Sequence, residues 1–253
     1  MLAEQASFAS ENSAVTAGHA LVFAPHLPQW DGGRFFTPAT RTLTGLGYRV
    51  TVVDTLAMLD GAMTSITELA TRWSTELAAL DRVDLLAGNA LGGAVAQALA
   101  ATVQPAHGVV VVSGPTHADD ALAGKLSAIA DLAAECRVAE SLALLDRLVV
   151  PEGAAPAPSR MDESTDSDMA RARIVGGMRL LLKVDLTAEV AAYRGRLMHL
   201  LGERSQLVTA ANVAGAAHHQ IVSVPGAGMR PHRDRPAAVA DHITRFVKES
   251  ASG

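Results

Sequence analysis

The segment between residues 83 and 103 constrains the fold of this chain more than any other. An apolar run, Val83-Asp84-Leu85-Leu86-Ala87, predicts a buried strand, and the run from Leu91 to Val103 predicts a helix. The short turn Gly88-Asn89-Ala90-Leu91-Gly92-Gly93 joins them. Glycines in such a turn allow a strained tip residue and close packing of its neighbours. The segment therefore predicts a strand that turns sharply into a helix, with Ala90 at the tip.

The rest of the chain alternates short apolar runs with longer amphipathic ones. Runs of the first kind predict strands at 20–24, 48–53, 108–113, 196–201 and 220–224. Runs of the second kind predict helices at 34–44, 65–80 and 236–248. This alternation predicts an α/β fold with a mostly parallel central sheet and helices on both faces.

The length of the chain fits one compact domain with an insertion. Residues 19–253 suit a single α/β domain, and the segment from Thr116 to about Asp185 breaks the rhythm with alanine- and leucine-rich stretches. We interpret that segment as a helical cap with a mobile Pro/Ala-rich linker from Pro151 to Pro158. Residues 1–18 have no basic start and no long apolar run, which predicts a flexible leader and not a signal peptide.

Composition excludes several classes of partner. The net charge is −5 and aromatic residues make up 4%, so we expect no nucleic acid partner. No run of about 18 apolar residues occurs, so we expect no membrane span. The single cysteine, Cys136, fits a reducing, cytoplasmic location. His218-His219 lacks a third ligand at metal spacing, so we predict no metal, and we expect no cofactor. A homodimer is compatible with these features.

From about Ala20 onward the chain resembles the α/β-hydrolase family at four places. They are the loop Pro25-His26-Leu27-Pro28-Gln29-Trp30, the segment from Gly47 to Asp54, the turn at Ala90, and the tail segments 201–205, 224–229 and 231–236. In that family the first loop helps to form an oxyanion hole, the turn presents a serine nucleophile, and the tail carries the acid and the histidine of a triad. The resemblance implies the α/β-hydrolase fold.

The chain departs from the family pattern at every triad position. Ala90 stands at the serine position, Ser205 near the acid position, and Met229 at the histidine position. Backbone N–H groups of Leu27 and Leu91 could still point at a substrate oxygen. Because a triad acts as a unit, we expect no turnover through an acyl-enzyme.

Three other polar residues are candidates for catalysis. His26 lies in the oxyanion loop and could bind a carbonyl or enolate oxygen, or it is a solvent-exposed loop residue. Asp31 could accept a proton, or it belongs to the turn Asp31-Gly32-Gly33. His232 could act as a general acid or base, or it caps the last helix.

A further set of residues is expected to line a binding pocket. Met229 and Ala90 make its floor apolar, and Trp30 is a candidate wall. Polar positions near strand ends add candidate contacts, because ligands of open α/β sheets bind at the carboxyl ends of strands. The full set of binding candidates is Leu27, Trp30, Asn89, Ala90, Leu91, Ser113, His117 and Met229.

These features favour a non-hydrolytic enzyme that acts on an apolar small molecule. The resemblance allows a cofactor-free cyclase, isomerase or lyase that works by positioning and proton transfer, in specialised metabolism of a bacterium. One alternative is an inactive pseudoenzyme that binds a ligand or a partner protein. A lesser alternative is a serine hydrolase or acyl transferase whose nucleophile has been replaced by alanine, with Glu203 and His232 as substitute acid and base.

Overall fold

A single seven-stranded sheet forms the centre of the molecule. The computed structural model describes residues 5–8, 17–80, 82–156 and 167–250. The strand order is β1-β3-β2-β4-β5-β6-β7, and every neighbouring pair is parallel except β1 and β3. The strands are β1 (Gln5–Phe8), β2 (Gly18–Phe23), β3 (Tyr48–Val53), β4 (Leu85–Asn89), β5 (Gly108–Val112), β6 (Leu197–Gly202) and β7 (Gln220–Val224). The predicted fold class is confirmed.

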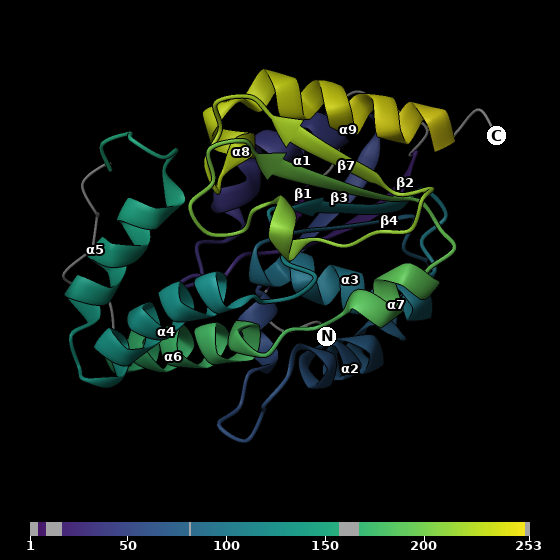
Figure 1. The fold of residues 1–253 in the computed structure, drawn as a ribbon. Helices are drawn as coiled ribbons and strands as arrows, with labels where there is room; N and C mark the ends of the chain where they lie inside the picture. The colour runs from purple at the N-terminus through teal and green to yellow at the C-terminus, as the bar shows by residue number, and fades with distance from the viewer. Residues whose placement is uncertain (1–4, 9–16, 81, 157–166, 251–253) are drawn as a thin grey trace.

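Helices cover both faces of this sheet (Figure 1). One face carries α1 (Thr37–Gly45), α8 (Pro231–Asp234) and α9 (Pro236–Ser250). The other carries α2 (Ile66–Leu77), α3 (Leu91–Val103) and α7 (Thr187–Ala192). Short 3-10 turns, η1 (Arg34–Phe36), η2 (Thr55–Met58) and η3 (Ala210–Asn212), lie in the connections. None of the described helices is long and apolar enough to cross a membrane.

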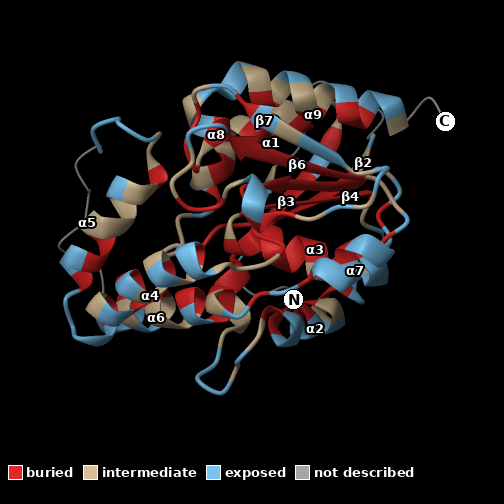
Figure 2. Ribbon diagram, viewed as in Figure 1, coloured by how far each residue is buried: buried red, intermediate tan, exposed pale blue. Residues whose placement is uncertain are grey.

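The sheet separates two hydrophobic cores. Side chains of β4 and β5 are buried on both faces, as strands in the middle of a parallel sheet must be (Figure 2). The core under α2 and α3 includes Trp73, whose ring meets Phe23 edge-on at 5.4 Å between centroids. The core under α1 and α9 includes Phe36 and Phe246. These two cores hold the sheet rigid, so its carboxyl edge is a fixed platform for a site.

The expected flexible leader is wrong in one part. Gln5–Phe8 forms strand β1, which pairs antiparallel with β3 from Gln5 opposite Val53 to Phe8 opposite Val50. The free edge of β3 offers backbone groups that a short extended segment can satisfy, a contact that local composition does not reveal. Residues 1–4 and 9–16 of the expected leader lie outside the described part of the chain.

Of the helices described between β5 and β6, three form a cap beside the sheet, whereas α7 packs on the sheet itself. The cap helices are α4 (Asp120–Ala134), α5 (Val138–Val149) and α6 (Ser167–Leu182) (Figure 1). The two ends of the insertion meet in an isolated antiparallel bridge between His117 and Asp185. Backbone hydrogen bonds beside it join Ala118 N–H to the Val184 carbonyl and Leu186 N–H to the Thr116 carbonyl. The last two residues of the expected linker, 157 and 158, lie outside the described residues, as do residues 159–166.

Candidate active site

The turn between β4 and α3 has the geometry of a nucleophile elbow. Ala90 adopts φ 51° and ψ −117°, and its N–H donates to the Val112 carbonyl at 3.0 Å. A Cβ on Gly88 would overlap the Gly92 carbonyl, and one on Gly92 would overlap the Phe23 carbonyl. Only glycine fits either place, so the chain keeps a strained tip residue whose side chain is a methyl group.

The residues on either side of Ala90 have distinct roles. Leu91 is the first residue of α3, so its N–H has no partner within the helix and remains free to bind an oxygen. Asn89 is buried, and its side-chain amide donates to the Val112 carbonyl at 2.7 Å. That bond joins the elbow to β5. Asn89 therefore supports the elbow, and it also lines the cavity described below.

Ser205 and Met229, which the resemblance aligns with the acid and the histidine, are in contact with each other. The Ser205 hydroxyl lies 3.8 Å from the Met229 sulfur, in the geometry of a weak hydrogen bond. Met229 is buried, and its N–H donates to the Val149 carbonyl at 3.1 Å. Neither side chain can take over a triad role. The thioether of Met229 is not a base, and the neutral hydroxyl of Ser205 cannot replace the carboxylate that orients and stabilises a histidine base.

A small cavity of about 60 Å³ lies over the elbow. Its lining is mostly apolar and comes from both the sheet edge and the cap. Binding sites for small organic molecules are commonly about 300–1,000 Å³, so a ligand needs the cap side chains to move. The lining residues are Pro25, His26, Phe35, Asn89, Ala90, Leu126, Leu145, Val149, Met178, Leu181, Leu207, Met229 and Arg230.

His26 is the most unusual polar residue of this lining. The side chain is 8% exposed, and neither ring nitrogen has a hydrogen-bond partner of ordinary geometry. Burial, and then the positive charge of Arg173, lower the pKa of His26 to about 4. The ring packs against α6 so closely that a Cβ on Gly177 would lie 2.7 Å from its Cδ2. His26 is therefore a neutral imidazole at neutral pH, held in place by packing, with one donor and one acceptor unused.

Arg230 brings a cation to the same cavity. No hydrogen bond or ion pair reaches its guanidinium from the described residues, and burial lowers its pKa. The group lies 5.4 Å from the centroid of the Phe35 ring, which also lines the cavity. Asp146 and Asp234 act on this guanidinium only at longer range. A half-buried cation with no carboxylate in direct contact is suited to hold an oxygen with negative charge.

A buried ion pair fastens the cap to the oxyanion loop. Arg173 of α6 makes two hydrogen bonds of 2.8 Å to the carboxylate of Asp54, which follows β3. Its Nε also donates to the carbonyl of Leu27 at 2.9 Å. Asp54 in turn accepts a bond from the N–H of Leu56. The cap helix and the loop that carries His26 are thus held as one unit.

Other predicted site residues lie away from the cavity lining. Trp30 is half-buried and packs against the core under α1 and α9. Asp31 has one carboxylate oxygen that is buried without a partner, on the loop before η1. His232 is fully buried between Phe35 and Phe36, with ring centroids 5.2 and 4.8 Å away. Burial is the main cause that lowers the pKa of His232 to about 3.

The two candidates after β5 are also outside the lining. Ser113 is fully buried, adopts φ 48°, and its hydroxyl has no partner. His117 lies at the neck of the cap, where it forms the bridge to Asp185. The structure therefore brings His26, Asn89, Ala90 and Met229 together at one cavity, and places Trp30, Asp31, Ser113, His117 and His232 elsewhere. Among the residues it describes, no group of three or more His, Cys, Asp or Glu side chains could hold a metal ion.

The cap residues of the lining and Arg230 are not among the predicted site residues. Met178 and Leu181 face the cavity from α6, and Arg173 anchors that helix. Their spacing along the helix is that of an ordinary buried face, so it does not reveal what the face covers. The sequence does hold a signal for Arg230, because this residue directly follows Met229, which the resemblance aligns with the histidine of the family.

Comparison with solved structures identifies the fold. A bromoperoxidase from Bacillus anthracis superposes with a TM-score of 0.73 at 14% identity, covering 96% of this chain and 94% of that one. MenH from S. aureus gives 0.73 at 12% identity over 99% and 100% of the two chains. An esterase from Exiguobacterium antarcticum gives 0.70 at 13% identity over 96% and 94%. No family model and no curated protein matches the sequence. The chain has the α/β-hydrolase fold.

Proposed function

We propose that this protein is a non-hydrolytic enzyme that moves a proton next to the carbonyl group of a largely apolar small molecule. His26 carries the proposal, since it is a buried imidazole with two unpartnered nitrogens at the cavity above Ala90. The proposal covers isomerisation, elimination and cyclisation through an enolate, without a covalent intermediate on the protein.

The cavity residues would divide the chemistry between them. The lone-pair nitrogen of His26 takes the proton, and this nitrogen is free at neutral pH because the pKa of His26 is about 4. Arg230 and the N–H of Leu91 hold the oxygen on which negative charge develops. The apolar lining strengthens both interactions by excluding water. The proton then returns to another carbon, or leaves with a departing group.

Two alternatives make different demands on the same residues. A ligand-binding pseudoenzyme would use the apolar lining but not the basicity of His26. A serine hydrolase with an exchanged nucleophile would need a substitute acid and base. Glu203 is exposed and accepts a bond from the Gly226 N–H, and His232 is enclosed by aromatic rings. Those positions favour the first proposal over the hydrolase.

The proposal is tested with apolar β,γ-unsaturated and β-hydroxy ketones. Conversion of either kind gives a conjugated ketone, whose ultraviolet absorbance reports the rate. We expect catalysed conversion by the natural sequence and a loss of about 100-fold or more with His26→Phe, the scale of general acid–base catalysis. The matched control is His218→Phe, which changes an exposed histidine away from the cavity.

Each outcome separates the candidate functions. Conversion that depends on His26 supports the proposal. Tight binding of the same ketones with no conversion points to the pseudoenzyme. Equal rates in natural protein and His26→Phe contradict the role given to His26.

A further inference from the structure

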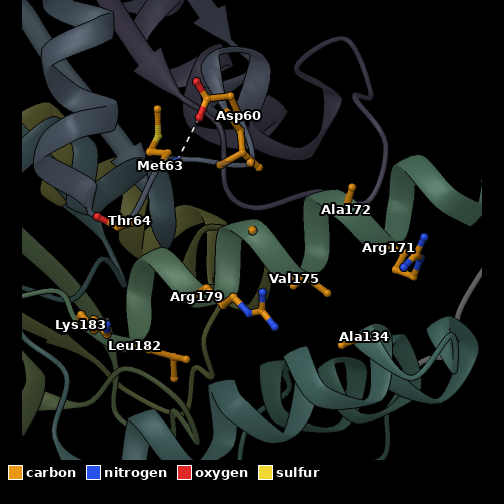
Figure 3. Close-up of a pocket in the computed structure, with 13 residues that line it drawn as sticks. Asp60, Met63, Thr64, Ala134, Arg171, Ala172, Val175, Arg179, Leu182 and Lys183 are labelled. Atoms are coloured by element: carbon orange, nitrogen blue, oxygen red, sulfur yellow. Dashed lines mark hydrogen bonds between the residues drawn. The ribbon is translucent and has the colours of Figure 1, made fainter.

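A second, larger cavity lies outside the candidate active site, on the opposite side of α6. It has a volume of about 870 Å³ and is bounded by α6, by the loop of residues 59–64 and by Ala134 at the end of α4 (Figure 3). We call this cavity the α6 groove. Met178 and Leu181 of the same helix face the inner cavity, whereas Arg179 and Leu182 line the α6 groove. The two sites are therefore separate.

The floor of the α6 groove is apolar along most of its length. Met63 of the loop lies on one side of the helix (Figure 3), and Leu59 of the same loop also lines the groove. Val175 and Leu182 come from the helix itself. Gly176 lets the loop approach, since a Cβ there would lie 2.6 Å from the Leu59 side chain. Such a surface gains free energy when an apolar chain covers it.

A row of positive charges follows the same helix. Arg171, Arg179 and Lys183 all line the α6 groove, and with Val175 they recur at intervals of four residues, which places them on one stripe. The row from residue 171 to 183 is about 18 Å long at 1.5 Å per residue. Arg171 pairs with Asp168 at 3.1 Å. Arg179 and Lys183 are exposed and have no ion-pair partner among the described residues.

The negative charge of the groove is already neutralised. Asp60 is the acidic residue of the lining, and its carboxylate forms an ion pair with Arg72. The positive charges of Arg179 and Lys183 are therefore not balanced within the groove. The two residues lie one helical turn apart, next to the apolar floor. The lining contains no aromatic side chain on which bases could stack.

From this juxtaposition we infer that the α6 groove binds an amphipathic organic anion, with its carboxylate or phosphate head group at Arg179 and Lys183. The apolar chain of the ligand lies over Leu59, Met63 and Val175. A cavity of this size suits one such molecule.

Calorimetric titration of the full chain tests this site. The probes are dodecanoate and dodecyl phosphate below their micelle-forming concentrations, with dodecanol and inorganic phosphate as partial ligands. We expect both anions to bind more tightly than either partial ligand, and more weakly as salt is added. The two head groups distinguish a carboxylate ligand from a phosphate ligand, and tight binding of either supports the inference.

Two double variants locate the binding. Arg179→Gln with Lys183→Gln is expected to weaken it at least 10-fold. Arg41→Gln with Arg194→Gln removes the same charge from exposed positions outside the groove and should leave binding unchanged. Circular dichroism confirms that both variants are folded.

Three results would overturn the inference. Equal affinity in natural protein and the groove variant places the ligand elsewhere, including the cavity over Ala90. An equal loss in both double variants reveals only a general charge effect. Sedimentation with anionic phosphatidylglycerol vesicles, without binding of the free anions, identifies a lipid surface instead.

Discussion

At the scale of single residues, the backbone at Ala90 has the conformation of a nucleophile elbow, whereas its methyl side chain cannot act as a nucleophile. The backbone at this residue is held at φ 51° by packing of Gly88 and Gly92, not by any requirement of a nucleophile. A serine would fit the same backbone, since it differs from alanine by one hydroxyl. The resemblance to the α/β-hydrolase family therefore predicts that the side chains of Ala90, Ser205 and Met229, and not the backbone of the elbow, exclude triad chemistry.

Restoring the serine alone should not restore esterase activity. In Ala90→Ser the new hydroxyl shares the cavity with Met229, which contacts Ser205, and these two side chains provide neither a histidine base nor a carboxylate to orient one. We expect hydrolysis of p-nitrophenyl butyrate to stay at the level of the natural protein. The comparison is Ala90→Ser combined with Ser205→Asp and Met229→His, which supplies a complete triad. Rapid hydrolysis by the single variant would show that another base reaches the site.

The pH dependence of catalysis should report His26. Burial and the charge of Arg173 lower the pKa of His26 to about 4, so the basic form is present through the neutral range. We expect kcat/KM for ketone conversion to be flat from about pH 6 to 8 and to fall as the pH approaches 4. A profile that instead falls near pH 6.5, the ordinary value for histidine, would contradict a buried base.

At the scale of elements, a buried ion pair fastens the cap to the sheet. Arg173 and Asp54 have side chains that are 13% and 1% exposed and join α6 to the end of β3. Loss of one partner leaves the other charge buried without compensation, which is far more costly than loss of an exposed pair.

Arg173→Leu should therefore lower the free energy of unfolding by about 3–5 kcal/mol. Arg171→Leu breaks an exposed pair on the same helix and should cost less than about 1 kcal/mol. Urea denaturation measures both. The double variant Asp54→Leu with Arg173→Leu should recover part of the loss, because no unpaired charge remains. Equal effects of the two single variants would show that the buried pair does not hold the cap.

At the scale of the whole molecule, buried histidines link stability to pH. His26, His199 and His232 have no hydrogen-bond partners of ordinary geometry, and burial is the main cause that lowers their pKa values to about 4, 4 and 3. In the unfolded chain these groups return to about 6.5. The unfolded state then binds more protons between about pH 6.5 and 4, so acid favours unfolding in that window.

The free energy of unfolding should fall by about 1.4 kcal/mol per pH unit for each such histidine as the pH drops below 6.5. Above that pH the contribution is complete. His232→Phe keeps an aromatic ring between Phe35 and Phe36. It should reduce the slope of the free energy of unfolding against pH by the contribution of one histidine. His218→Phe changes an exposed ring and should not alter it. Urea denaturation at several pH values gives the slopes, and an unchanged slope in His232→Phe would refute the linkage.

The sequence by itself determined the alternation of strands and helices, the elbow at Ala90 and the place of the cap. Those features depend on local periodicity and on glycines that permit a tight turn. Both can be recognised from residues that are neighbours in the sequence. Strand β1 was not determined in this way, because pairing with the edge of β3 is a contact between distant segments.

Only the tertiary structure decided which side chains share the cavity. It joined His26 to Met178 of the cap and to Arg230, while it buried His232 between aromatic rings and turned Trp30 to the opposite core. The physical reason is that a side chain near a motif, such as that of His232 three residues after Met229, can face either side of a helix or loop. Packing against elements that are remote in the sequence selects the side. Burial and distance from other charges also set the pKa of each histidine, and neither is defined before the chain has folded.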